Sequence, residues 1–279
     1  MLVNEPVWVP AGHRNWASVS LTSERFAIQV QQTAQHDFDF ETACNFTAQK
    51  LAEDFDGYPL YLGLSGGLDS ELVANVMLRN GIKFIPFVLD ISGVNDLEVW
   101  HAYHWCWRNK VTPVIYKMTV PEFETNFLPN LRRLRDTHQA GLVMILWMAD
   151  YIAALGGKLI TAVAELNLDL DREIFYSNTV DYVLNLFDGG RHPTGFFSYT
   201  PELVLSYVKQ FDTTVNEQYN KIKFYGVGPR PKYNWTSEFG LVSRRSGALI
   251  SAWLKKTANS QRHNWGSQQA VIDQLTQTK

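Results

Sequence analysis

The sequence YPLYLGLSGGLDSELVAN at residues 58–75 carries the strongest structural signal in the chain. The apolar run at residues 58–64 predicts a β-strand, and the helical spacing of apolar residues after Leu68 predicts a helix. Glycine lets the backbone adopt conformations closed to other residues and lets a ligand approach closely. The amide groups of a helix N-terminus attract anions. A strand, a glycine loop and a helix start in this order indicate a phosphate site.

The loop at residues 65–70 is not the commoner nucleotide loop, because the ending Gly-Lys-Ser/Thr is absent. Its string Ser-Gly-Gly-Leu-Asp-Ser resembles the PP-loop of the N-type ATP pyrophosphatases. That superfamily includes the synthetase domains of asparagine synthetase, GMP synthetase and NAD synthetase. A glycine turn with Asp69 as the helix cap is the alternative interpretation. It explains the turn but not the two serines and the acid around it.

The resemblance covers roughly residues 55–175 and implies which residues hold ATP. In the family the loop binds the β- and γ-phosphates that leave as pyrophosphate. Carried over to this chain, Ser65, Asp69 and Ser70 are the predicted catalytic residues, and Asp69 is the predicted ligand of Mg²⁺. The predicted ATP-binding residues of the loop and the strand end before it are Leu64, Ser65, Gly66, Gly67, Asp69 and Ser70.

A second acid is expected because Mg²⁺ usually takes one or two carboxylates together with phosphate oxygens. The family often carries it after the fourth core strand, where this chain reads TAVAELNLD at residues 161–169. Glu165 is the predicted second metal and pyrophosphate contact, with Asp169 and Asp171 behind it. The glycines found there in asparagine synthetases are missing. An ordinary acidic loop at a strand end is the alternative.

The resemblance also implies an adenine site at the end of the second core strand. There the backbone groups of Val88, Leu89 and Asp90 would read the base edge, whereas a cap of the next turn is the alternative for Asp90. Gln139 is predicted to contact the nucleotide, since it opens the helix before the fourth strand together with Thr137 and His138. A local hydrogen-bonding role is the alternative for this histidine. Candidate cations for the transferred nucleotide are Arg132, Arg133, Arg135, Arg244, Arg245, Lys255 and Lys256.

Strands and helices alternate from residue 58 to residue 164. Strands are expected at residues 58–64, 83–91, 111–118 and 158–164, with helices at 68–78, 97–108 and 138–155 between them. This order predicts an α/β fold with a parallel sheet and helices on both faces. The resemblance implies the Rossmann-like class of the adenine nucleotide alpha hydrolases. Ligands of such sheets lie beyond the carboxyl ends of the strands.

Three regions are expected along the chain. Residues 1–40 are a β-rich N-terminal segment with strands near 7–9, 17–21 and 25–30. Residues 41–177 are the PP-loop ATP pyrophosphatase domain, which an amphipathic helix at 40–55 introduces. Residues 178–279 are a mostly helical basic region, with helices predicted at 179–187, 201–207 and 247–256 and a loop at 188–194.

Charge and cysteine content limit the class of protein. Residues 221–279 contain 10 Lys and Arg against 2 Asp and Glu, although the net charge of the chain is −3. Such a basic segment can face polyphosphate or nucleic acid, and a solvated basic helix is the alternative. The separated Cys44 and Cys106 indicate a reducing compartment. With no secretory signal and no apolar run long enough to span a membrane, we expect a cytoplasmic location without a membrane partner.

The function implied by the resemblance is that of an enzyme. It would bind ATP and Mg²⁺, adenylate a carboxylate or carbonyl oxygen of a substrate, release pyrophosphate and join a nitrogen nucleophile from ammonia or an amine donor. The expected nearest type is the synthetase domain of asparagine synthetase without its glutaminase, since that glutaminase needs a cysteine where this chain has Leu2. The alternatives are a PP-loop enzyme that modifies a nucleobase or nucleic acid, and a module that binds ATP without turnover.

Overall fold

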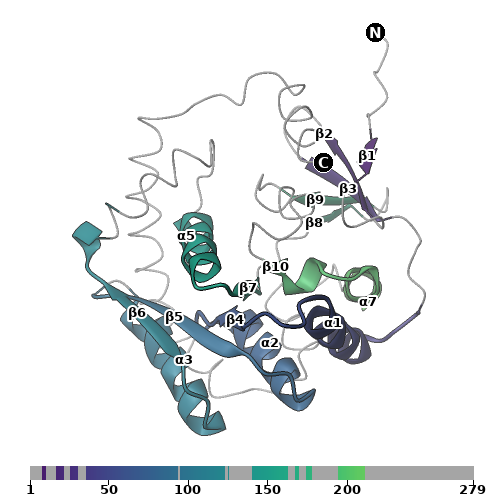
Figure 1. Cartoon of the computed structure of the whole chain (residues 1–279). Helices are drawn as coiled ribbons and strands as arrows, with labels where there is room; N and C mark the ends of the chain where they lie inside the picture. Colours follow the sequence, from purple (N-terminus) through teal and green to yellow (C-terminus); the bar gives the residue numbers. More distant parts are fainter. Residues whose placement is uncertain are drawn as a thin grey trace.

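The described part of the chain forms two five-stranded sheets (Figure 1). The computed structural model describes residues 8–10, 17–21, 26–30, 36–93, 95–122, 125, 140–162, 167–169, 174–177 and 194–210. In the first sheet the strand order is β10-β7-β4-β5-β6, and all neighbours are parallel. Its strands are β4 (Leu60–Gly63), β5 (Ile85–Ile91), β6 (Val114–Met118), β7 (Lys158–Thr161) and β10 (Thr194–Gly195).

The second sheet is antiparallel and has the order β1-β2-β3-β9-β8. It joins the predicted N-terminal strands to two strands that follow β7 in the chain. The register places Phe26 opposite Ser177 and Gln29 opposite Ile174. Its strands are β1 (Trp8–Pro10), β2 (Ala17–Leu21), β3 (Phe26–Val30), β8 (Asn167–Asp169) and β9 (Ile174–Ser177).

Helices lie on both faces of the parallel sheet, which confirms the predicted α/β class (Figure 1). The helices α2 and α3 lie on one face, and α5 lies on the other. The helix α1 packs against α2 and α7. The described helices are α1 (Phe40–Asp54), α2 (Leu68–Arg79), α3 (Asp96–Asn109), α5 (Ala140–Ala154) and α7 (Pro201–Gln210), with the 3₁₀-helix η1 at Phe196–Ser198.

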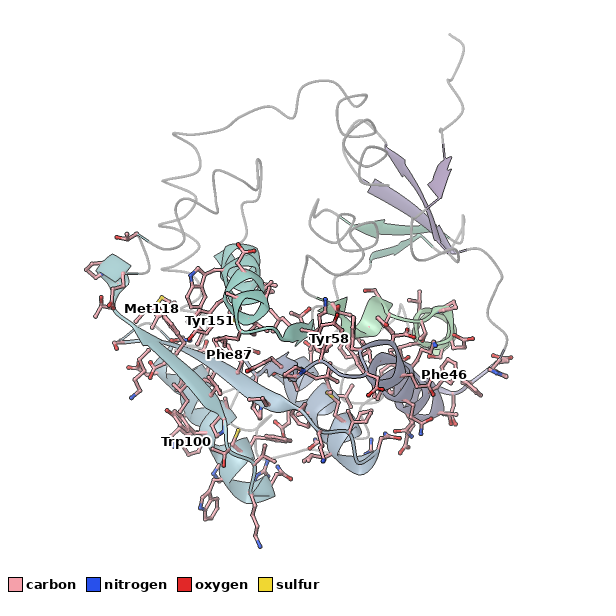
Figure 2. The ribbon with its side chains drawn as sticks, in the orientation of Figure 1. Phe46, Tyr58, Phe87, Trp100, Met118 and Tyr151 are labelled. Carbon is pink, nitrogen blue, oxygen red and sulfur yellow. The ribbon has the colours of Figure 1, made fainter. Side chains whose placement is uncertain are left out.

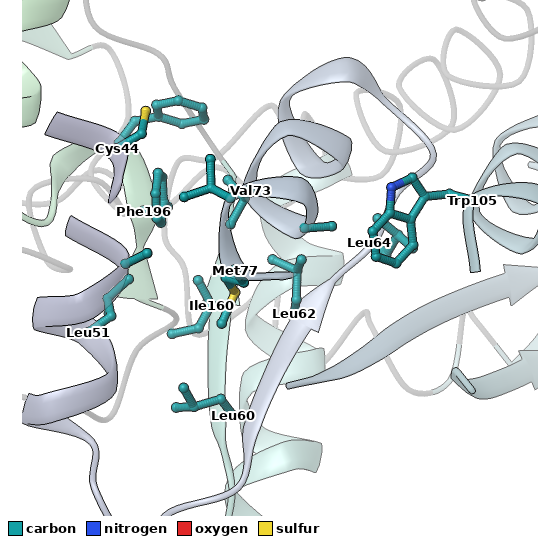
Figure 3. Packing of buried hydrophobic residues seen from close by; sticks show 14 of the residues in the cluster. Cys44, Leu51, Leu60, Leu62, Leu64, Val73, Met77, Trp105, Ile160 and Phe196 are labelled. Atoms are coloured by element: carbon teal, nitrogen blue, oxygen red, sulfur yellow. The ribbon is translucent and has the colours of Figure 1, made fainter. Parts of the chain in front are cut away.

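Alternation along the strands divides the core into two layers, because successive side chains of a strand point to opposite faces. On β4, Leu60 and Leu62 face the layer that α1, α2 and α3 cover (Figure 3), while Tyr61 faces the α5 layer. Figure 2 shows Phe87, Met118 and Tyr151 gathered between α5 and the strands β5 and β6. A strand that is apolar at every position therefore indicates a sheet covered on both sides.

Most of the predicted core elements are confirmed, with boundaries shifted by a few residues. The helix predicted at residues 68–78 is confirmed as α2, which ends before Asn80, and Gly81 then takes a φ of +67°. The predicted loop at residues 188–194 is wrong at its end, because Thr194 begins β10 and pairs with Ile160. The helices predicted at residues 179–187 and 247–256 lie outside the described residues. In the part that is described, no helix is long and apolar enough to cross a bilayer.

Replacing Leu62 by Ala tests the core of the parallel sheet. Leu62 has no exposed surface and lies in the middle of the central strand, so we expect the free energy of unfolding to fall by about 2–5 kcal/mol. Urea denaturation followed by circular dichroism measures this loss. Val114→Ala on the edge strand β6, where the side chain is 38% exposed, is the control and should cost less than about 1 kcal/mol. Equal losses in the two variants would contradict this arrangement of the core.

Candidate functional site

The 65–70 loop lies where the strand order of the parallel sheet reverses. From β4 the chain moves outward to β5 and β6, and it then returns across the sheet to β7 on the other side of β4. Since β4 and β7 are parallel, with Leu62 opposite Ile160, their carboxyl ends meet at one edge. In doubly wound sheets, ligands bind at such switch points. The topology therefore places the 65–70 loop at the expected position for a ligand.

Gly66 of the loop packs tightly against the start of α3. Its φ of +76° lies in the left-handed region that favours glycine. A Cβ built on Gly66 would overlap the carbonyl oxygen of Glu98 and would lie 3.0 Å from the Cβ of His101. Glycine is thus required here both by the backbone conformation and by the close approach of α3.

Hydrogen bonds link Ser65, Gly67 and Ser70 in a ring. The amide of Gly67 donates to Ser65 Oγ over 3.3 Å, and Ser70 Oγ donates to the carbonyl of Gly67 over 3.0 Å. The two hydroxyls lie 3.2 Å apart. Because the single proton of Ser70 is used on Gly67, the hydroxyl of Ser65 donates to Ser70. The loop therefore presents an amide and two hydroxyls that are held together by their mutual contacts.

The N-terminus of α2 begins directly after the glycines. Gly67 is the capping residue and supplies no side-chain cap, and the first hydrogen bond of the helix runs from Glu71 N to Gly67 O over 3.1 Å. The backbone amides of residues 68–70 precede this first helical hydrogen bond and belong to the N-terminal end of the helix. Asp69 is a half-buried residue of the first turn. The alternative interpretation of Asp69 as the helix cap is therefore wrong.

A single carboxylate beside a phosphate loop suits a hard cation such as Mg²⁺, which needs few protein ligands when phosphate oxygens complete its shell. Asp69 provides such a carboxylate. Within the described residues there is no group of three or more His, Cys, Asp and Glu that could hold a metal by themselves. The predicted second ligand, Glu165, lies outside the described residues. The fit of Mg²⁺ thus rests on Asp69 together with the oxygens of a bound phosphate.

The end of β5 reaches beyond the end of β4. The last contact between them is from Leu64 N to Phe87 O, over 2.9 Å. Past this point the side chain of Asn95 takes the place of a neighbouring strand, since Nδ2 donates to Leu89 O and Oδ1 accepts from Ile91 N, each over 2.8 Å. The carbonyl of Leu89, one of the backbone groups predicted to read the adenine edge, therefore already accepts a hydrogen bond.

The other two predicted base contacts lie in the ladder with β6. Val88 is buried and is opposite Ile115, while Asp90 is opposite Lys117. Asp90 Oδ2 lies 3.9 Å from Lys117 Nζ, a long ion pair. No described contact tests whether these residues touch a nucleotide, so the adenine site stays a prediction.

Two polar contacts that the sequence did not reveal join α2 to α3. Trp105 Nε1 donates to Asn75 Oδ1 over 3.0 Å, and Arg108 Nη2 lies 3.4 Å from the buried carboxylate of Glu71. Both contacts cross between helices that are far apart in the chain, so no local spacing indicates them. They hold the two helices whose first turns border the loop.

Of the other candidate residues, the structure describes one. Asp169 lies in β8, opposite Ile174 of β9. The remaining predicted contacts lie outside the described residues; they are Arg132, Arg133, Arg135, Thr137, His138, Gln139, Glu165, Asp171, Arg244, Arg245, Lys255 and Lys256.

The cysteines do not resemble reactive thiols. Cys44 and Cys106 are free and buried. Burial raises the pKa of the Cys106 thiol to about 11 and raises the pKa of Cys44 further. Thiols with raised pKa values stay protonated at neutral pH and are poor nucleophiles.

Comparisons with known proteins found distant likenesses. No family model matches the chain. Over 90 residues it is 29% identical to an uncharacterized protein of Acanthamoeba polyphaga mimivirus. The matched region covers 32% of this chain and 51% of that protein. The chain therefore spans about half the length of this curated relative.

Several solved structures, among them the following three, are similar to the chain at low identity. NMN synthetase from Francisella tularensis has a TM-score of 0.39 and 11% identity, covering 82% of this chain and 98% of its own. NH3-dependent NAD synthetase from Campylobacter jejuni has a TM-score of 0.37 and 16% identity, covering 81% and 96%. Glutamine-dependent NAD+ synthetase from Acinetobacter baumannii, in complex with ADP, has a TM-score of 0.38 and 14% identity, covering 90% and 48%. None of the three is an asparagine synthetase, and likeness at this level does not determine the activity of the chain.

Replacing Gly66 by Ala tests the close approach of the loop to α3. A left-handed backbone costs a non-glycine residue about 1–2 kcal/mol, and overlap with the Glu98 carbonyl adds to this cost. Gly81→Ala is the matched control, because Gly81 also has a positive φ but has no atom within 4 Å of the position that a Cβ would take. Urea denaturation should show Gly66→Ala to be less stable than Gly81→Ala by at least about 1 kcal/mol. Equal stability would mean that α3 does not press on the loop.

Proposed function

We propose that the chain is an ATP-dependent ligase that forms a carbon–nitrogen bond and releases AMP and pyrophosphate. The observation that carries this proposal is the Ser-Gly-Gly-Leu-Asp-Ser loop, which lies between β4 and the N-terminus of α2 at the switch point of the sheet. Both its sequence and its position suit a nucleotide phosphate.

The loop would bind the β- and γ-phosphates. The amide of Gly67 and the hydroxyls of Ser65 and Ser70 are hydrogen-bonding groups that now contact one another. A phosphate can replace these mutual contacts with bonds to its own oxygens, which are stronger because they are charge-assisted. The positive end of the α2 dipole adds to the attraction.

Asp69 is the proposed Mg²⁺ ligand, and Glu165 is the proposed second carboxylate. Asp69 belongs both to the 65–70 loop and to the first turn of α2. A bound Mg²⁺ would neutralise the charge of the phosphates and orient them. Asp69 would hold the metal ion close to the pyrophosphate while the pyrophosphate leaves.

The proposed reaction consists of two substitutions. A carboxylate or carbonyl oxygen of the substrate attacks the α-phosphate of ATP, the bond from the α-phosphorus to the bridging oxygen breaks, and pyrophosphate leaves with that electron pair. A nitrogen nucleophile, ammonia or an amine, then attacks the adenylated carbon and loses a proton, and AMP leaves with the oxygen. Asparagine synthetase-like amide formation is the specific form of this chemistry that we propose.

A second candidate is a PP-loop enzyme that acts on a nucleobase within a nucleic acid. The observation that favours it is the basic composition of residues 221–279, with 10 Lys and Arg against 2 Asp and Glu. Such a segment would attract a polyanionic substrate. The same adenylation step applies to a base carbonyl oxygen.

The test is pyrophosphate release from ATP in the presence of Mg²⁺, with separate pools of amino acids, carboxylated metabolites, nucleobases and tRNA or DNA. Release with an amino-acid or carboxylate pool supports the ligase and identifies its substrate class. Release with nucleobases or nucleic acid supports the second candidate. Binding of ATP, seen as a thermal shift, with no release in any pool would contradict both and indicate a binding module.

Asp69→Asn tests the metal assignment. The amide keeps the shape of the side chain but loses the charge that a divalent ion needs, so we expect Mg²⁺-dependent pyrophosphate release to fall by at least about 100-fold. Asp56→Asn is the matched control, because Asp56 is exposed in the turn before β4, at the opposite end of that strand from the loop. It should retain the activity of the unmodified chain. Undiminished release in Asp69→Asn would exclude Asp69 as a metal ligand.

A further inference from the structure

We propose that Asn95 is a positioning residue for the phosphate loop and acts on it through α3. This inference rests on the proposed function, since it concerns the loop that would hold the pyrophosphate of ATP. Three contacts link the residue to the loop: from Asn95 to the free edge of β5, from Asn95 into the first turn of α3, and from Glu98 of that turn to Gly66.

The first contact ties Asn95 to the sheet. Its amide spans Leu89 O and Ile91 N with two bonds of 2.8 Å, and so continues the hydrogen-bonding pattern that stops where β4 ends. Both bonds need a side chain with a donor and an acceptor on one flat group, which asparagine provides. An amide on a one-carbon stem also has few rotamers, so the two bonds define its position closely.

The second contact connects Asn95 to the start of α3. Asn95 is the residue that precedes the helix, and its own carbonyl accepts the first helical hydrogen bond from Val99 N over 3.0 Å. The side chain of Asn95 makes no cap bond to the helix, because it is used on β5. The side chain of Asp96 accepts a hydrogen bond from the amide of Gly93 over 3.0 Å. The first turn of α3 is therefore anchored directly to the sheet edge.

The third contact reaches the loop. Glu98, three residues after Asn95, presents its carbonyl to Gly66 at a distance that leaves no room for a Cβ. A shift in the first turn of α3 would change the space that Gly66 occupies and would alter the ring of bonds on Gly67. The geometry of the phosphate donors thus depends on where Asn95 holds this turn.

The rest of α3 has its own anchors, which separates positioning from folding. Ala102, Trp105 and Cys106 are buried in the core, and Trp105 also bonds to Asn75. Removal of the Asn95 amide should therefore leave the helix folded and release only its first turn. The expected result is a large change at the loop with a small change in the melting temperature.

The test compares Asn95→Ala and Asn95→Asp across a pH range. A protonated aspartic acid can donate to Leu89 O and accept from Ile91 N, as the amide does, whereas an ionised one has no donor and repels the carbonyl. The charged groups nearest in sequence or across the strands are Asp90, Asp96, Glu98, His101 and Lys117, and they remain the same in every variant. The unmodified chain therefore corrects for their titration at each pH.

Two readouts are used on the full chain. Calorimetry measures the affinity for inorganic pyrophosphate and for ATP with Mg²⁺, and hydrogen exchange of peptides covering residues 64–71 measures the loop without any ligand. Asn95→Ala should bind at least about 10-fold more weakly at all pH values and exchange faster in the loop. Asn95→Asp should resemble Asn95→Ala at pH 8 and approach the unmodified chain as the pH falls to about 4, where an ordinary aspartic acid is half protonated. Asn109→Ala, which removes an amide bonded to Trp105 O at the far end of α3, should change neither readout.

The two readouts distinguish this inference from the proposed function. If the unmodified chain binds neither ligand but loop exchange follows the pattern above, the proposed function fails and the role of Asn95 stands. If the unmodified chain binds ATP while loop exchange and affinity stay unchanged in Asn95→Ala, the role of Asn95 is refuted. An Asn95→Asp variant that matches Asn95→Ala at every pH would also refute it, since the donor–acceptor pair would then be irrelevant.

Discussion

The approach of the Glu98 carbonyl to Gly66 is the contact on which the arrangement of the site depends. It is made possible by a residue without a side chain in a left-handed conformation. Because Gly66 turns the chain so sharply, Gly67 can begin α2 immediately, and Ser65 and Ser70 come within hydrogen-bonding distance. A strand end, two helix starts and a polar ring therefore meet in a very small volume.

Apolar and polar contacts have different roles around this point. The alternating side chains of the strands define the two core layers and hold the helices against the sheet. Apolar packing alone allows small sliding of one helix along another, because it is not directional. The directional contacts, such as Trp105 with Asn75 and Arg108 with Glu71, set how far α2 and α3 advance toward the loop. Asn95 does the same between α3 and β5.

The sequence was sufficient for four of the five strands of the parallel sheet and for its class. Continuous apolar runs mark β4, β5 and β7, and glycine or asparagine marks the helix ends, as at Asn80. It was insufficient where structure depends on distant partners. Thr194 and Gly195 form a strand too short to show any periodicity. The pairing of β3 with β9 joins segments about 150 residues apart along the chain, and local patterns contain no information on such a pairing.

The candidate site was predictable to the same degree. The loop was evident because its glycines and serines act locally, within six residues. For Asn95 the local sequence indicates only a turn or a helix start, since asparagine favours both the position before a helix and a tight turn. Which backbone its side chain bonds depends on the strand beside it. β4 ends opposite Phe87, two residues before Leu89, so the backbone of Leu89 bonds to the Asn95 side chain instead of to β4. The register of the sheet determines this contact, and the local sequence does not.

The charges around the loop explain why a metal ion belongs in the proposed chemistry. The first turn of α2 contains Asp69 and Glu71, and the first turn of α3 contains Asp96 and Glu98. These acids suit the positive ends of the helix dipoles, but they repel a polyphosphate at close range. Of the described cations nearby, Arg108 pairs with Glu71. In the proposed function, a divalent ion held by Asp69 would offset this repulsion, and the same acids that stabilise the helix starts would then favour a metal-bound nucleotide over a free one.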